Sequence, residues 1–168
     1  MLSRRSLLLL TGAGFVRAAP GDDRRFALRV FRRINEIREK NGAPALGWSE
    51  AVAECAREQS RRKVELRFPG HNDPERGDVA QRLTAAGIHW MQCGENIFME
   101  RGYTDPVNYA VVSWWYSEGH RMNLLDPEYT LTGVGLAEAR DKTWYATQIF
   151  VTPLLTQQRQ PPVRSRHG

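Results

Sequence analysis

Two imidazoles and two carboxylates that could do chemistry together stand at His71, Glu95, Glu118 and His120. If the fold brings them into one cleft, they could hold a divalent cation such as zinc, with His71 and His120 as ligands and positions left open for water. Their spacing differs from a compact metal motif such as His-Glu-x-x-His, so the pattern alone does not define a metal site. The alternative is a hydrogen-bonded network in which each His pairs with a Glu and no ion is held.

The same groups could also serve a hydrolase. Glu95 or Glu118 would be the candidate catalytic carboxylate, acting as general base, and Ser117 or water would be the nucleophile. The run from Ser117 to His120 does not make a triad, because nucleophile and base must meet in space with a third group that orients the base. A polar pocket without an activated nucleophile is more typical of recognition than of turnover, so we expect a binding site.

Only two cysteines, Cys55 and Cys93, are present. In an exported chain they would meet an oxidising environment, which favours a single disulfide between them. The alternative is two buried thiols that behave as small hydrophobic side chains.

The net charge of +5 suggests nucleic-acid binding at first sight, but the basic residues concentrate at the chain ends. Residues 1–18 and 153–168 hold three arginines each and no acid. Without these six, 18 basic and 19 acidic residues remain. We therefore expect no nucleic-acid partner.

The two ends differ from the rest of the chain. Residues 1–18 carry Arg4-Arg5, an apolar run and a small-residue cleavage site, which predicts an export signal of either the twin-arginine or the general secretory type. The apolar run is too short to span a bilayer comfortably, so no transmembrane helix is expected in the mature chain. We interpret 19–25 as a short linker, 26–152 as one domain, and 153–168, rich in Pro, Gln and Arg, as a disordered tail.

Apolar side chains at helical spacing predict four helices, each with recognisable end signals. The first covers 23–40, the second follows the N-cap Ser49 and ends before Phe68, the third begins at Asp73-Pro74 and ends at Gly87, and the fourth runs from Asp105-Pro106 to Ser117. Glu118 is therefore expected at a helix end.

Residues with strand character follow in the second half of the chain. Gly94 to Met99 is short, apolar and partly β-branched, and 131–137 and 143–151 alternate with period two, which predicts an antiparallel hairpin. Gly133 and Gly135 leave room for an element packed against this hairpin. Helices first and strands later predict an α+β domain.

Four motifs in sequence order resemble the CAP superfamily, named after cysteine-rich secretory proteins, antigen 5 and pathogenesis-related proteins. They are Gly94-Glu95-Asn96-Ile97, the run from Trp115 to Leu125 (WYSEGHRMNLL), Gly133-Val134-Gly135, and Tyr145-Ala146-Thr147-Gln148-Ile149-Phe150. The likeness covers roughly 26–152 and takes the bacterial form of the family. Several motifs in order are more specific than any one of them.

The resemblance implies an α-β-α sandwich, with a central antiparallel sheet between helices and a cleft lined by two His and two acidic residues. Carried onto this chain, it assigns His71, Glu95 and Glu118 to the cleft, with Asn96 beside them. Eukaryotic members have a further His in the last motif, where this chain has Tyr145, so the resemblance makes Tyr145 a further candidate cleft residue. The bacterial Gly-His-Arg sequence supplies His120 instead.

Three function classes remain open on this basis. The chain is expected to be an exported, secreted or periplasmic protein whose cleft binds an unknown ligand, which could be a small molecule, a lipid, a glycan or a protein. The alternatives are a metal-assisted hydrolase that uses the same cleft and a structural envelope protein. A divalent cation such as zinc is the one cofactor that the resemblance suggests.

Overall fold

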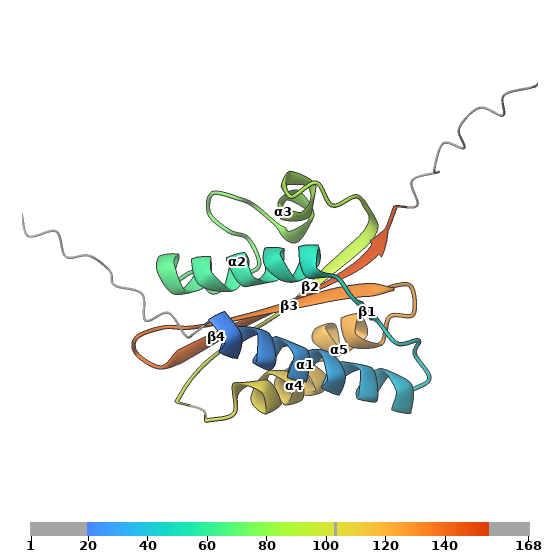
Figure 1. Cartoon of the computed structure of the whole chain (residues 1–168), viewed down its shortest axis with the longest axis horizontal. Coiled ribbons are helices and arrows are strands. Elements are labelled where there is room, and N and C mark those ends of the chain that lie inside the picture. The colour runs from blue at the N-terminus through green and yellow to red at the C-terminus, as the bar shows by residue number, and fades with distance from the viewer. Residues whose placement is uncertain (1–19, 103, 155–168) are drawn as a thin grey trace, which may run out of the picture.

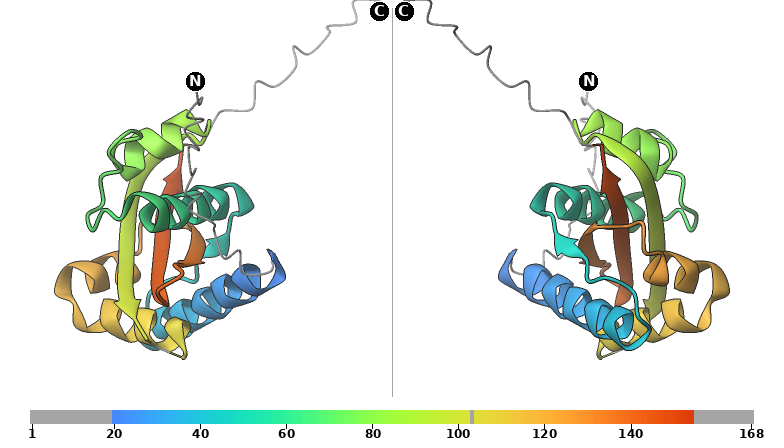
Figure 2. Two further views of the ribbon diagram at one scale, coloured as in Figure 1. Left: turned by 90° about the vertical axis from the view of Figure 1, so that its left-hand side faces the viewer. Right: turned by 90° about the vertical axis from the view of Figure 1, so that its right-hand side faces the viewer.

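The structure is a computed structural model that describes residues 20–102 and 104–154. Its core is a four-stranded sheet in the order β1-β3-β4-β2. The strands are β1 (Gly47–Trp48), β2 (Trp90–Arg101), β3 (Leu131–Glu138) and β4 (Thr143–Pro153). β2 and β3 both pair antiparallel with β4, whereas the short β1 pairs parallel with β3. Figure 2 shows β2 and β4 side by side in both views.

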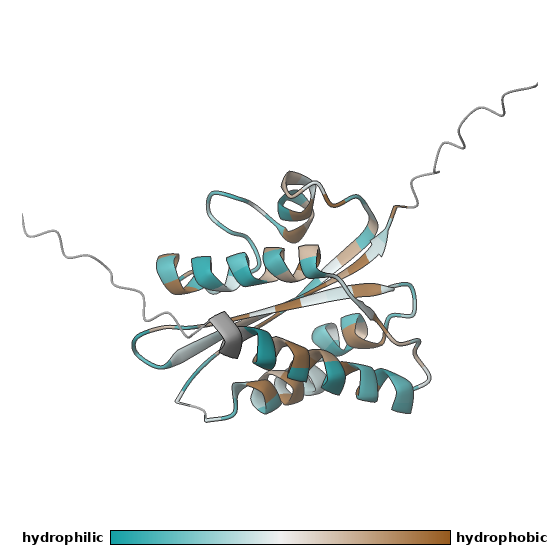
Figure 3. Cartoon of the chain, viewed as in Figure 1, coloured by the Kyte–Doolittle hydropathy of each residue, from teal (hydrophilic) through white to brown (hydrophobic). Residues whose placement is uncertain are grey.

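Helices cover both faces of this sheet and make the α-β-α sandwich that the resemblance implied (Figure 1). One face carries α2 (Glu50–Leu66) and α3 (Val79–Ala85). The other carries α1 (Pro20–Lys40), α4 (Pro106–Tyr116) and α5 (Glu118–Leu125). Along α1, hydrophilic and hydrophobic residues alternate, as expected of a helix with one face against the sheet (Figure 3). The α+β fold class is confirmed.

Two hydrophobic clusters hold the layers together. The larger lies between the sheet and α1, α4 and α5, and includes Val30, Ile34, Trp114 and Phe150. The smaller lies between the sheet and α2 and α3, and it is built from Val52, Ala56, Leu83, Ile149 and Val151.

Gly133 and Gly135 let α2 lie directly on β3, as the sequence predicted. A Cβ atom on Gly133 would stand 2.1 Å from the backbone nitrogen of Ala53, and one on Gly135 would stand 2.1 Å from that of Arg57. The helix backbone occupies the space that any side chain would need. This contact fixes the height of α2 above the sheet.

A buried arginine joins α1 to the far end of α5. The Arg38 side chain is fully buried and donates to the backbone carbonyls of Pro44, Leu124, Asp126 and Tyr129. Burial lowers its pKa from the ordinary value, and nearby Asp126 opposes that shift. Arg38 thus satisfies carbonyls at the C-terminal end of α5 that the helix itself leaves open.

The third helix begins later than predicted. Asp73 is not its N-cap; the Asp73 side chain accepts from the backbone N–H groups of Glu75 and Arg76 and from the Arg62 guanidinium. These bonds close a turn that ends at Gly77, whose φ of +74° stops helix formation. Asp78 caps α3 in its place and forms a capping box with Gln81.

The first helix starts earlier than expected. α1 starts at Pro20, so 20–25, expected as a linker, form its first turns. The predicted export signal at 1–18 lies outside the described residues, as does the expected tail beyond Leu154. Within the described chain, no helix is both long and apolar enough to cross a membrane.

Candidate functional site

Glu95 is the buried centre of the candidate site. It lies on β2 opposite Ile149, and its side chain is only 2% exposed. Oε2 accepts from the guanidinium of Arg82, a residue of α3 whose side chain is equally buried. Oε1 contacts Nδ1 of His71 at 2.9 Å. The carboxylate is thus held from two sides, one of them an ion pair shielded from water.

His71 enters the site from the loop between α2 and α3. Its backbone carbonyl accepts from Gln59 at 3.3 Å and from Arg82 at 3.0 Å, which fixes the main chain at this point. Because an ionised carboxylate only accepts, the Glu95 contact requires that His71 carry its proton on Nδ1. The neutral ring then presents Nε2 as a hydrogen-bond acceptor, on a side chain that is 51% exposed.

His120 approaches from the opposite helix layer. Asn96, fully buried on β2, donates from Nδ2 to the His120 backbone carbonyl at 3.1 Å, and Asn123 donates to Oδ1 of Asn96 at 2.9 Å. These amides tie α5 to β2. Burial lowers the pKa of the His120 imidazole below its ordinary value, and the charge of His71 lowers it further. The two imidazoles therefore lie within electrostatic reach of each other across the strand that carries Glu95.

The buried side of the His120 ring indicates its tautomer. Nδ1 is buried and has no hydrogen-bond partner. An unpaired buried N–H is rarer in proteins than an under-used acceptor, so the neutral ring is expected to carry its proton on Nε2. His71 thus offers an acceptor nitrogen and His120 a donor nitrogen.

The two remaining predicted site residues, Glu118 and Tyr145, make no hydrogen bond or ion pair with this group in the described chain. Glu118, in the first turn of α5, is exposed and makes no hydrogen bond or ion pair within the described part of the chain. Tyr145 is buried on β4 opposite Met99. It stands four residues along β4 from Ile149, the partner of Glu95, which is about 13 Å along the strand. Burial raises the pKa of Tyr145. The charge of Asp141 raises this pKa further, and that of Arg67 lowers it.

The residues around Glu95 do not fit a metal ion. Both carboxylate oxygens are already engaged, and the nearest charged partner is the Arg82 cation, which repels a second cation. Among residues 20–102 and 104–154, no group of three or more His, Cys, Asp or Glu side chains is placed to hold one. The hydrogen-bonded network that was the alternative to a metal site is present only in part, because His71 pairs with Glu95 whereas no Glu pairs with His120 in the described chain.

Cys55 and Cys93 are free thiols, so the expected disulfide is not formed in this structure. Both are half-buried and pack against the smaller hydrophobic cluster around Leu83 and Ile149. Burial raises the pKa of each thiol, which keeps both in the unreactive protonated form. They fill space as small hydrophobic side chains, which was the alternative to a disulfide.

Two charged residues of the site were missed at the sequence level. Arg82 and Lys63 are each about 2% exposed, and both face Glu95. The sequence did hold a signal: Lys63 continues the spacing of Val52, Ala56 and Gln59, so it falls on the buried face of α2. A charged residue on the apolar face of a helix often marks a site.

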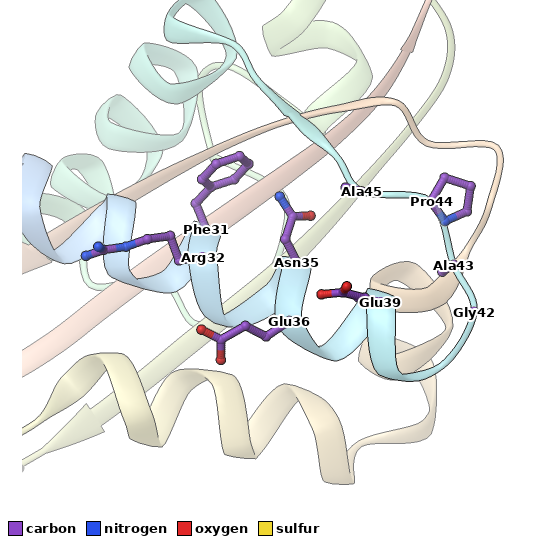
Figure 4. A pocket seen from close by; sticks show the side chains of 9 residues that line it. All are labelled: Phe31, Arg32, Asn35, Glu36, Glu39, Gly42, Ala43, Pro44 and Ala45. Atoms are coloured by element: carbon purple, nitrogen blue, oxygen red, sulfur yellow. The ribbon is translucent and has the colours of Figure 1, made fainter.

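A separate hollow lies elsewhere on the surface. A groove of about 720 Å³ follows α1 and the loop after it, between Phe31, Glu39 and Pro44 (Figure 4). None of the predicted site residues lines it.

Comparison with known proteins shows the family of this chain. Residues 31–150 match the sequence model of the Cysteine-rich secretory protein (CAP) family, and the chain belongs to that family. It is 31% identical to the Bacillus subtilis (strain 168) protein YkwD over 134 residues, which are 80% of this chain and 50% of YkwD. The chain thus spans about half the length of that relative.

Solved structures show the same fold. An extracellular protein containing an SCP domain from Bacillus anthracis str. Ames superposes with a TM-score of 0.69 at 29% identity, covering 80% of this chain and 44% of that one. An outer surface protein from Borrelia burgdorferi superposes with a TM-score of 0.73 at 16% identity, covering 84% of this chain and 100% of that one.

Proposed function

We propose that this protein is an exported CAP-domain binding module, and that the cleft between His71 and His120 recognises a neutral polar group. The observation that supports it most is the pairing of His71 with the buried, Arg82-bound Glu95, with His120 near by. The predicted N-terminal signal supports export, as does the extracellular description of the Bacillus anthracis relative.

The chemistry of the ligand follows from the two ring nitrogens. His71 offers an acceptor and His120 a donor, so the complementary group both donates and accepts, as a hydroxyl or an amide does. Sugars and peptides carry such groups. A fully anionic ligand would lie beside the acceptor nitrogen of His71, whose lone pair disfavours it.

Binding fits the site better than hydrolysis does. In the described chain the Ser117 hydroxyl makes no hydrogen bond to either imidazole, and as the N-cap residue of α5 it makes no side-chain capping bond. A nucleophile needs a base within hydrogen-bond reach and a third group that orients that base. Glu95 orients His71, but no nucleophile in the described chain contacts the ring.

The test is a titration of the full chain with N-acetylglucosamine tetramer and with a tetra-alanine peptide amide, followed by ¹⁵N–¹H NMR. At least one of these probes is expected to shift the signals of His71, Asn96 and His120, and the shifts are expected to disappear in His71→Ala and in His120→Ala. His89→Ala is the matched control, because His89 is an exposed histidine outside the site. Shifts confined to the α1 groove, or binding that survives both substitutions, would contradict the proposal.

A further inference from the structure

Lys63 is a buried cation that the hydrophobic packing of α2 does not require. It stands in the last turn of the helix and is 2% exposed, on the same face as Val52 and Ala56. Its ammonium donates to the backbone carbonyl of Gly70 and lies 4.3 Å from the centroid of the Phe68 ring. A methionine would fill similar space without the cost of burying a charge.

The partners of Lys63 are the residues that lead into His71. α2 ends at Leu66, and Arg67 takes up a left-handed conformation with φ 53° and ψ 38°, which turns the chain back. Residues 68–70 then fold over Lys63, with the Phe68 ring buried. The next carbonyl, that of His71, is bound by Gln59 and Arg82. Three side chains from α2 and α3 therefore hold two consecutive carbonyls of this loop.

The charges around Lys63 come from three further elements. Glu95 on β2 and Asp73 in the following turn raise its pKa, and Arg82 on α3 lowers it. Burial is the largest cause and lowers the pKa to about 8. At neutral pH most molecules therefore keep the ammonium form, which donates to the Gly70 carbonyl and attracts the Phe68 ring.

We propose that Lys63 is a positioning residue of the cleft, which holds the loop of residues 68–70 so that the His71 ring presents Nδ1 to Glu95. This inference rests on the proposed function, because it assigns to Lys63 the orientation of a ligand-binding imidazole. Without the ammonium, the loop loses one hydrogen bond and one cation–π contact directly before His71. The ring would then exchange between orientations and tautomers.

The experiment compares ligand-free wild type, Lys63→Met and Lys63→Arg by the ¹⁵N chemical shifts of the His71 ring, at a pH where both site histidines are neutral. Wild type is expected to show the Nδ1–H tautomer. Lys63→Met is expected to show averaged ring shifts, because the loop before His71 is no longer held through the Gly70 carbonyl. Lys63→Arg is expected to restore the wild-type tautomer, because it keeps both charge and donors. Lys40→Met, at an exposed lysine, is the control and is expected to change nothing.

Wild-type ring shifts in Lys63→Met would overturn the proposal. If that variant does not fold, Phe68→Leu removes the ring beside the ammonium and is expected to shift His71 in the same direction; unchanged His71 shifts in that variant would overturn it as well. The readout uses no ligand, so a failure of every probe to bind wild type would refute the proposed function and leave this test intact.

Discussion

Replacing Glu95 by glutamine is expected to lower the free energy of unfolding by about 3–5 kcal/mol, because it leaves the buried Arg82 guanidinium without a counter-charge. The substitution keeps the shape of the side chain, so the decrease in the free energy of unfolding reflects the loss of the negative charge and not a change in packing. Urea unfolding followed by circular dichroism measures it.

Glu118→Gln is the matched control for this substitution. Glu118 is exposed and makes no hydrogen bond or ion pair with any residue that the structure describes, so its change is expected to stay within about 0.5 kcal/mol. In the double variant Glu95→Gln with Arg82→Met, part of the lost stability is expected to return, since the buried guanidinium that Glu95 had paired is removed as well. Equal effects of Glu95→Gln and Glu118→Gln would show that the buried ion pair does not exist.

Gly135→Ala is expected to lower the free energy of unfolding by about 3 kcal/mol or more, since the new methyl group would overlap the backbone of α2. The Cβ atom would stand 2.1 Å from the Arg57 backbone nitrogen and 2.3 Å from the Ala56 carbonyl carbon. Backbone atoms of a packed helix cannot move aside as a flexible side chain can, so α2 must lift from β3. The midpoint of thermal unfolding is the simplest measurement.

Gly119→Ala provides the comparison for a glycine without such a neighbour. Gly119 lies in α5, and a Cβ atom there would meet nothing within 4 Å. Alanine is a better helix former than glycine, so this variant is expected to gain about 0.5–1 kcal/mol. A Gly135→Ala protein as stable as Gly119→Ala would contradict the direct contact between α2 and β3.

Much of the fold could be predicted because its signals are local. Each of these signals comes from residues within a single helix or strand. Examples are the alternating residues of β3 and β4, the apolar stripe of α1 and the Pro106 start of α4. The prediction that Asp73 starts a helix was wrong because its carboxylate binds Arg62, a residue eleven positions earlier on α2. The two-residue β1 was missed because so short a strand is defined only by its pairing with β3.

Part of the site could be predicted, because some of its residues belong to recognisable motifs. Glu95 and His120 stand within motifs that resemble the family, and His71 was assigned to the cleft by the resemblance although it lies outside those motifs. The structure pairs His71 with Glu95 and places it within electrostatic reach of His120. Arg82 and Lys63 belong to no motif, and their part in the site depends on which helix faces pack against Glu95. Tyr145 and Glu118 were assigned by position in a motif, and their part in the site stays a prediction, since neither makes a hydrogen bond or ion pair with this group in the described chain.

The proximity of His71 and His120 is tested most directly by the pKa of His120, measured by NMR in wild type and in His71→Gln. In wild type this pKa is expected below the ordinary value of 6.5, because burial and the charge of His71 both lower it. Removing the His71 charge is expected to raise it part of the way back, while His89→Gln leaves it unchanged. A His120 pKa that is the same in wild type and in His71→Gln would contradict a shared cleft.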